Sequence, residues 1–168
     1  MADEASDPQP SELESRAPVE EDLVALCRRL NELGARYLVC GGFAIIHAGY
    51  ARLTGDIDLL IDASLENEAK VYAALEVFSD KAVRELKPGE VSEYTVVRVG
   101  DEVTVDLMAS ASGIRFDEAE PHIVRREVQG VSIPFASPAL LLRMKQTHRE
   151  KDALDRMFLE RKIREDNP

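Results

Sequence analysis

Apolar residues in the first half of the chain recur with helical spacing in some segments and form short continuous runs in others. In residues 20–33 they fall every three or four positions, which predicts an amphipathic helix that Gly34 ends. Residues 37–40 predict a short buried strand, which Gly41-Gly42 interrupt. The pattern further predicts a strand at 56–61 and helices at 43–50 and 65–79.

The second half begins with paired extended segments. Residues 94–99 and 103–108 are separated by a short segment that contains Gly100-Asp101. Residues 124–128 and 131–135 flank Gln129-Gly130, so both pairs predict β-hairpins. Ser137-Pro138 then predicts a helix start, with Ser137 as the N-cap and Pro138 at the first position. Helix is expected to continue to about residue 162, with a break near His148.

Helices and strands interleave along the chain, and tight turns join the later strands. This order predicts an α/β (α+β) domain with a mixed β-sheet flanked by helices and with C-terminal helices. The length of 168 residues suits one domain with a substantial core, which we place at residues 19–164. Residues 1–18 are acidic and nearly free of apolar side chains, so we expect a disordered tail there.

Composition narrows the class of protein. Apolar residues make up 45% of the chain and charged residues 32%, as in soluble globular proteins. No apolar run is long enough to cross a bilayer, and the N-terminal residues lack the apolar stretch of a secretory signal, so no membrane partner is expected. Cys27 and Cys40 have no metal-type spacing, and we expect both to be buried in a protein of the reducing cytoplasm.

The net charge of −11 is unevenly distributed. Residues 1–22 hold eight acidic residues and one arginine, whereas residues 143–164 hold eight basic and four acidic residues. The overall acidity argues against a broad nucleic-acid-binding surface. It leaves room for a local basic wall facing a polyanionic ligand.

Three aspartates lie at strand positions that can converge. Asp56 and Asp58 are two residues apart on one predicted strand, so both side chains point to the same face, while Ile57 points into the core. Asp106 lies inside the otherwise apolar strand at 103–108. If the two strands are neighbours, the three carboxylates suit hard cations such as Mg²⁺ or Mn²⁺. The alternative is a set of solvated strand carboxylates.

Gly41 and Gly42 lie between a predicted strand and a predicted helix. Because they lack side chains, the backbone can approach a phosphate there, and the helix N-terminus offers free N–H groups. Thirteen residues separate Gly42 from Asp56, which is enough for a helix and a turn back to the next strand. An ordinary tight turn is the alternative.

This combination of motifs resembles the nucleotidyltransferase superfamily related to polymerase β. There a strand, a Gly-Gly or Gly-Ser pair, a helix, an Asp-x-Asp strand and a third acid follow in this order. The matching segments are Tyr37-Leu38-Val39-Cys40-Gly41-Gly42, Arg52-Leu53-Thr54-Gly55-Asp56-Ile57-Asp58-Leu59-Leu60, and Asp106. The form Arg-x-Thr-x-Asp-x-Asp and the preceding His47-Ala48-Gly49-Tyr50 are similar to AbiEii-type toxin nucleotidyltransferases. So is an apolar helix ending in Lys145 and followed by Arg149, Lys151, Asp152 and Asp155.

The resemblance implies transfer of a nucleoside monophosphate from a nucleoside triphosphate to an acceptor hydroxyl. Mg²⁺ or Mn²⁺ would be held by Asp56, Asp58 and Asp106, and Asp106 would help to activate the hydroxyl. The implied nucleotide contacts are Gly41, Gly42, Arg52, Thr54, Lys145 and Lys151. The acceptor is left open among an RNA 3′ end, a protein hydroxyl and a small molecule.

Other interpretations remain open at the sequence level. Two pairs of opposite charges lie four residues apart, as in exposed ion pairs on a helix: Lys151 with Asp155, and Asp152 with Arg156. Lys145 is equally compatible with a solvated lysine on a helix. For the whole chain, the alternatives are a catalytically silent nucleotide-binding module and a toxin–antitoxin component. A homo-oligomer is also open, so the protein partner would be either an antitoxin or a second copy of the chain.

Overall fold

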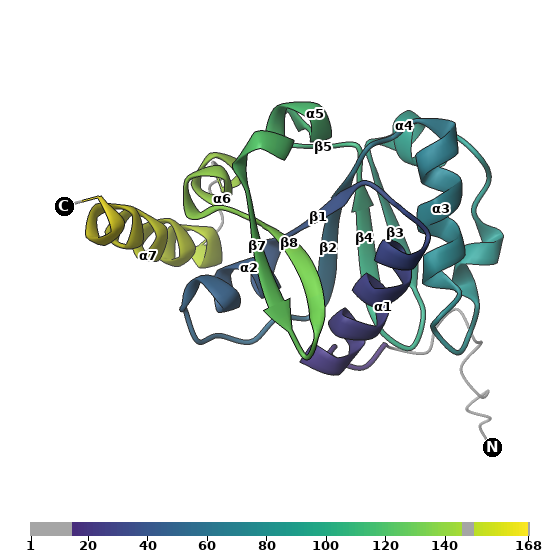
Figure 1. Cartoon of the computed structure of the whole chain (residues 1–168), viewed down its shortest axis with the longest axis horizontal. Helices are drawn as coiled ribbons and strands as arrows, with labels where there is room; N and C mark the ends of the chain where they lie inside the picture. Colours follow the sequence, from purple (N-terminus) through teal and green to yellow (C-terminus); the bar gives the residue numbers. More distant parts are fainter. Residues whose placement is uncertain (1–14, 146–149, 168) are drawn as a thin grey trace, which may run out of the picture.

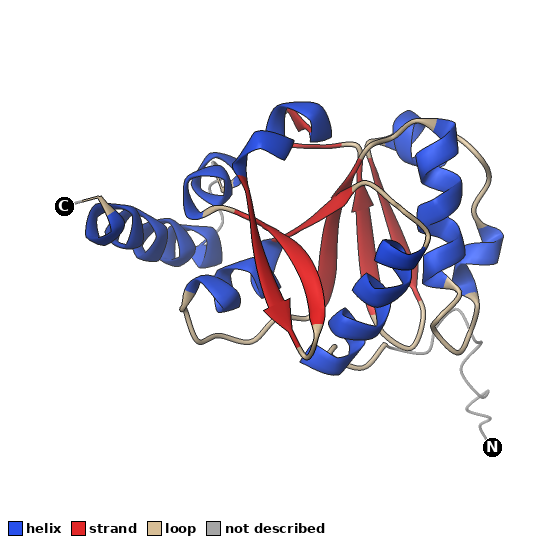
Figure 2. Cartoon of the chain, in the orientation of Figure 1, coloured by secondary structure: helices blue, strands red, loops and turns tan. Residues whose placement is uncertain are grey.

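A six-stranded mixed sheet forms the centre of the computed structural model, which describes residues 15–145 and 150–167. The strand order is β3-β4-β2-β1-β8-β7. The strands are β1 (Tyr37–Cys40), β2 (Asp56–Ile61), β3 (Val96–Gly100), β4 (Thr104–Met108), β7 (Ile123–Val128) and β8 (Val131–Ala136). β2 pairs in parallel with β4 and antiparallel with β1, so the sheet is mixed and the expected fold class is confirmed (Figure 2).

Helices surround this sheet. They are α1 (Glu20–Glu32), α2 (Gly41–Ala48), α3 (Leu65–Leu75), α4 (Glu90–Tyr94), α5 (Phe116–Ala119), α6 (Pro138–Met144) and α7 (Glu150–Asp166). Two 3₁₀ turns, η2 (Ala82–Glu85) and η3 (Glu120–His122), and a short hairpin of β5 (Ser110–Ala111) and β6 (Ile114–Arg115) complete the fold. In Figure 1, α1 and α3 lie on the same side of the molecule, while α2, α6 and α7 gather at the opposite end, from which α7 extends outward.

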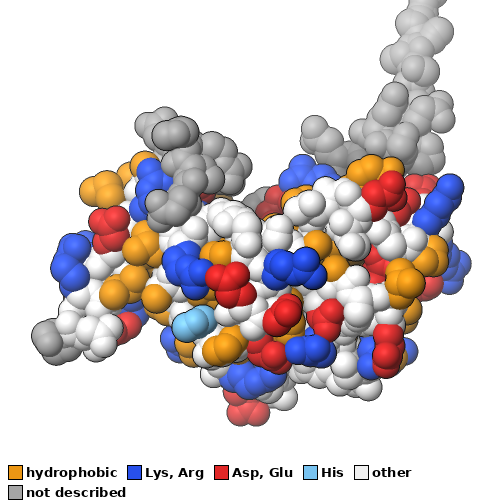
Figure 3. All heavy atoms as spheres, turned by 90° about the horizontal axis from the view of Figure 1, so that it is seen from above, with side chains coloured by type: hydrophobic (Ala, Val, Ile, Leu, Met, Phe, Trp, Pro, Cys, Tyr) orange, Lys and Arg blue, Asp and Glu red, His pale blue; other side chains and the backbone are white. Residues whose placement is uncertain are grey.

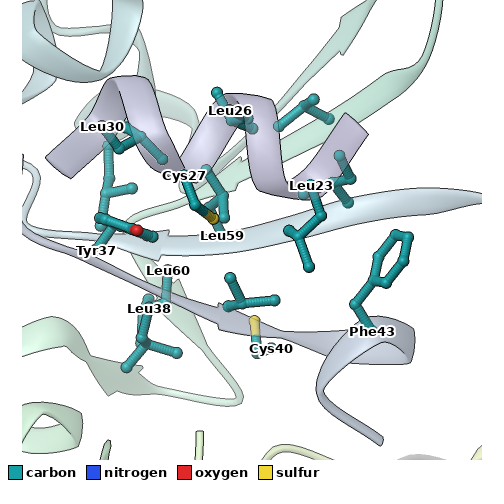
Figure 4. Packing of buried hydrophobic residues seen from close by; sticks show 14 of the residues in the cluster. Leu23, Leu26, Cys27, Leu30, Tyr37, Leu38, Cys40, Phe43, Leu59 and Leu60 are labelled. Atoms are coloured by element: carbon teal, nitrogen blue, oxygen red, sulfur yellow. The ribbon is translucent and has the colours of Figure 1, made fainter. Parts of the chain in front are cut away.

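The core forms where apolar stripes of the helices meet the strands. The stripe predicted on α1 is buried: Leu23, Leu26, Cys27 and Leu30 have no solvent exposure. Figure 4 shows this helix lying over the strands, with Cys27 directed toward Leu59 of β2. Cys27 and Cys40 are both free thiols and both buried, as expected.

Several predicted boundaries were wrong. The second helix begins at Gly41 rather than at residue 43, and it ends at Ala48 because Gly49 adopts a left-handed conformation. The third helix ends at Leu75, although Phe78 remains buried as expected. Tyr94 belongs to α4 instead of a strand, so β3 begins only at Val96.

Two further expectations concern the ends of the chain. Most of the expected tail, residues 1–14, and the expected break near His148 lie outside the described residues. Ser15 does have a described partner, because its hydroxyl donates to the carbonyl of Asp101 at 2.6 Å. Within the described ranges, no helix combines the length and apolar character needed to span a bilayer. The face drawn in Figure 3 shows basic and acidic side chains intermixed among its described residues.

Candidate active site

Asp56, Asp58 and Asp106 meet on two adjacent parallel strands. The register of β2 and β4 places Asp58 directly beside Asp106. One carboxylate oxygen from each of the three residues lies within 4.8 Å of the others. Ile57 is fully buried on the opposite face, as strand alternation requires. The fold therefore assembles the three acids that the sequence pattern singled out.

The surroundings of Asp58 disturb its ionisation. The pKa of Asp58 is raised to about 7, first by burial and then by the negative charges of Asp56 and Asp106. The positive charge of Lys145 acts in the opposite direction. A buried carboxylate beside two others is costly to ionise unless a cation lies close to it.

The glycines of the α2 turn allow close contact with Asp58 and Thr54. Gly41 has a φ of +65°, and a Cβ added to it would lie 2.7 Å from Cγ of Asp58. A Cβ on Gly42 would lie 2.6 Å from Cβ of Thr54. Thr54 in turn donates its hydroxyl to the carbonyl of Asp56 at 3.1 Å. Glycine is therefore required at both positions by the protein's own packing.

Arg52 and Lys145 are held by buried acids of α7. The Arg52 guanidinium donates to Asp155 Oδ2 at 3.2 Å, with Nε 3.1 Å from Asp155 Oδ1. The Lys145 ammonium lies 3.1 Å from Asp152 Oδ1 and 3.5 Å from Asp155 Oδ2. Asp152 is 0% and Asp155 1% exposed, which excludes the interpretation of these acids as solvated helix residues. Lys145, only 9% exposed, is likewise not a solvated lysine.

Arg98 is a site residue that the sequence patterns did not reveal. It is the cross-strand partner of Asp106 on β3 and forms ion pairs with both Asp106 and Asp56. An arginine between two valines on a strand gives no signal by itself. Knowledge of the hairpin register would have been needed to place it opposite Asp106.

Two adjoining cavities lie beside the carboxylates. One has a volume of about 130 Å³ and is lined entirely by polar residues and glycine: Gly42, Arg52, Thr54, Asp56, Asp58, Arg98, Asp106 and Lys145. The other, of about 150 Å³, shares Asp58 and Lys145 with the first and adds a wall of Cys40, Gly41, Met108, Ala111, Leu141 and Met144. Burial holds the pKa of the Cys40 thiol well above its usual value, so this wall includes a neutral sulfur.

The structure brings together all but one of the residues expected to contact the nucleotide. Gly41, Gly42, Arg52, Thr54 and Lys145 all line these cavities. Lys151 lies on α7, but its side chain is outside what the structure describes.

Several solved structures share this architecture, among them an adenylyltransferase and a nucleotidyltransferase-like protein. The lincosamide antibiotic adenylyltransferase LnuA, in its lincomycin-bound structure, aligns with a TM-score of 0.55 and 15% identity over 86% of this chain and 98% of its own. An antigenic nucleotidyltransferase-like protein from Paracoccidioides brasiliensis aligns with a TM-score of 0.50 and 17% identity, over 86% of this chain and 75% of its own. No family model matches the chain, and no curated protein matches it significantly. The chain has the nucleotidyltransferase-type fold.

The contact between Gly41 and Asp58 predicts that an alanine substitution at Gly41 lowers stability more than one at Gly34. Gly41→Ala and Gly34→Ala both place a side chain at a left-handed residue, which costs about 1–2 kcal/mol. Only Gly41→Ala should lose a further ~1–3 kcal/mol by overpacking, because nothing lies within 4 Å of a Cβ on Gly34. Urea denaturation measures both losses. In an Asp58→Ala background the excess at Gly41 should shrink, and equal losses for the two variants in the wild-type background would refute the contact.

The raised pKa of Asp58 predicts how the stability of metal-free protein depends on pH. Because this pKa is about 7 in the folded state against 3.8 for an ordinary aspartate, the folded state binds the additional proton between these values. Stability should therefore fall as the pH rises from about 4 to 7. Asp58→Asn should remove this fall and be more stable than wild type at pH 8 by on the order of 1–3 kcal/mol.

Urea denaturation in EDTA at several pH values tests this expectation. Glu66→Gln is a suitable control, since Glu66 is an exposed acid on α3. Its stability curve should stay parallel to that of wild type, whereas a parallel curve for Asp58→Asn would contradict the expectation.

The burial of Asp155 predicts that its substitution lowers stability far more than substitution of an exposed acid on α7. Asp155→Asn keeps the side-chain shape but leaves Arg52 and Lys145 short of a negative charge. It should lower the free energy of unfolding by about 3–5 kcal/mol. Glu165→Gln breaks only the exposed pair with Arg161 and should cost less than about 0.5 kcal/mol. Chemical denaturation of both variants decides the matter, and similar small losses would mean that Asp155 is solvated in solution.

Proposed function

We propose that this chain is a metal-dependent nucleotidyltransferase that moves a nucleoside monophosphate from a nucleoside triphosphate to an acceptor hydroxyl. The observation that carries the proposal is the convergence of Asp56, Asp58 and Asp106 beside a polar cavity that also holds Arg52 and Lys145. The fold of the chain supports it, because the two similar structures compared above are an adenylyltransferase and a nucleotidyltransferase-like protein.

The donor set of the three aspartates fits Mg²⁺ or Mn²⁺. All three offer carboxylate oxygens, the ligands that hard divalent cations prefer, and they already lie close enough to share an ion. Burial and the two neighbouring carboxylates raise the pKa of Asp58, and a cation close to it would offset both effects. A divalent cation held there would supply positive charge next to the reacting phosphate and lower the pKa of the acceptor hydroxyl.

The remaining cavity residues suit a triphosphate. The glycine turn places the start of α2 on the cavity walls, where N–H groups can bind phosphate oxygens. Arg52 and Lys145 provide positive charge on the same cavity, and Asp155 and Asp152 fix the directions of these side chains. Preorganised cations of this kind stabilise negative charge as it develops on a leaving group.

The reaction follows from these assignments. The acceptor hydroxyl oxygen forms a bond to the α-phosphorus, and its proton passes toward the Asp106 carboxylate. The bond between the α-phosphorus and the oxygen bridging to the β-phosphate breaks, and pyrophosphate leaves with the electron pair. Arg52 and Lys145 neutralise the charge that the pyrophosphate gains.

The second cavity offers space for another part of the substrates. Its wall of Met108, Leu141 and Met144 is apolar and adjoins Asp58. An RNA 3′ end, a protein hydroxyl and a small molecule all remain in the proposal as acceptors. The resemblance to AbiEii-type enzymes favours RNA, whereas the lincomycin-bound structure of a similar fold favours a small molecule.

Incubation with α-³²P-labelled nucleoside triphosphates and Mg²⁺ tests the proposal across RNA, protein and small-molecule acceptors. We expect label transfer that EDTA abolishes, and a loss of at least about 100-fold in Asp58→Asn because the site loses one of its charges. Glu66→Gln, an exposed acid outside the site, should retain full activity. If wild type shows no metal-dependent binding of a non-hydrolysable triphosphate by calorimetry, the proposal fails.

A further inference from the structure

Arg98 lies at the outer edge of the sheet, on the same face as the carboxylate cluster. β3 is an edge strand, and Arg98 is the register partner of Asp106 on β4. Its neighbours Val97 and Val99 are buried on the other face. Cross-strand partners project to the same side of a sheet, so the register directs Arg98 toward Asp106.

The guanidinium of Arg98 occupies the oxygens that a cation would use. Its Nε and Nη2 atoms donate to the two carboxylate oxygens of Asp106, both at 2.9 Å. Nη2 also lies 3.2 Å from Oδ2 of Asp56. A bidentate arginine–carboxylate pair has well-defined geometry and uses both oxygens of the acid. One arginine thus bridges two of the three carboxylates.

Arg98 differs from the other cations of the cavity in its freedom to leave. Its side chain is 64% exposed, whereas those of Arg52 and Lys145 are 18% and 11% exposed and contact Asp155. Release of Arg98 would therefore disturb no packed core. Ion pairs with so exposed a partner are weak, because water replaces much of what is lost.

We propose that Arg98 is a displaceable counter-ion that competes with the divalent cation for Asp106 and Asp56. The inference rests on the proposed metal site, and it assigns to Arg98 a role in setting metal affinity. In metal-free protein the guanidinium reduces the repulsion within the cluster. A divalent cation that binds the same oxygens weakens the ion pairs of Arg98 with both carboxylates.

The inference predicts that Arg98→Gln raises the affinity for metal, whereas ordinary structural damage would lower it. Titration calorimetry with Mn²⁺ alone should show about fivefold tighter binding to Arg98→Gln than to wild type, as expected for the loss of one exposed ion-pair competitor. Arg98→Lys keeps the charge but loses the bidentate geometry, so it should bind with intermediate affinity.

Arg125→Gln is the matched control. Arg125 is an exposed arginine on β7, the other edge strand of the sheet, and its substitution removes the same charge. It should leave the Mn²⁺ affinity within about twofold of wild type, since long-range charge effects are screened by salt.

Urea denaturation provides a second measurement. In EDTA, Arg98→Gln should be less stable than wild type because the carboxylates lose their counter-ion. In saturating Mg²⁺ this difference should disappear or reverse, since the variant binds the metal more tightly. Equal or weaker Mn²⁺ affinity in Arg98→Gln overturns the inference, as does a stability difference that Mg²⁺ leaves unchanged.

The two proposals fail in distinguishable ways. If wild type binds Mn²⁺ and Asp58→Asn does not, but Arg98→Gln gains no affinity, only the role of Arg98 is wrong. If neither wild type nor Arg98→Gln binds Mn²⁺, the proposed metal site is wrong and the competition falls with it.

Discussion

Repulsion among the carboxylates of Asp56, Asp58 and Asp106 determines which charged groups can surround them at this end of the sheet. Asp58 and Asp106 are register partners on adjacent parallel strands, so no side chain insulates one from the other. Burial makes the charge of Asp58 costly, the negative charges of Asp56 and Asp106 add to that cost, and the raised pKa of Asp58 is the consequence. The groups around the cluster respond to the same constraint: an arginine bridges its outer edge, and a lysine lines the cavity on its inner side. A site with this excess of negative charge is suited to binding cations, and through them a polyanion.

The glycine turn is tied to the same cluster by packing. The sequence pattern suggested that Gly41 and Gly42 allow a phosphate to approach the backbone. The structure adds a reason that operates without any ligand, because Cβ atoms at these positions would overlap Asp58 and Thr54. α2 and the loop after it return the chain antiparallel to β1, so that these two residues reach back to the point where the helix began. The number of residues between the glycines and the aspartates is thus set by the packing of the turn against Asp58 and Thr54.

Local patterns were sufficient for most of the core, and non-local contacts account for what they missed. The α1 stripe and the alternation in β2 depend on neighbouring residues, and both were predictable. α4 was not, because the N–H groups of its N-cap Gly89 and of Val91 donate to the buried carboxylate of Glu68, more than 20 residues earlier. A two-residue turn at Gly100-Asp101 would place Arg98 opposite Val103. The observed connection is longer and pairs Gly100 with Thr104, which moves Arg98 opposite Asp106. The burial of Asp155 likewise depends on cations from two distant segments.

The exposure of each cation decides what it can do for the cluster. Arg52 and Lys145 enter the fold together with Asp152 and Asp155, and breaking a buried pair leaves an uncompensated charge, so they are permanent parts of the cavity wall. Part of their charge is already cancelled by these two acids, which limits how far they can relieve the three strand carboxylates. The ion pairs of Arg98 are with the cluster itself, and its own side chain is 64% exposed. Because water can solvate Arg98 as it leaves, the cluster can exchange one cation for another while the interior pairs remain intact.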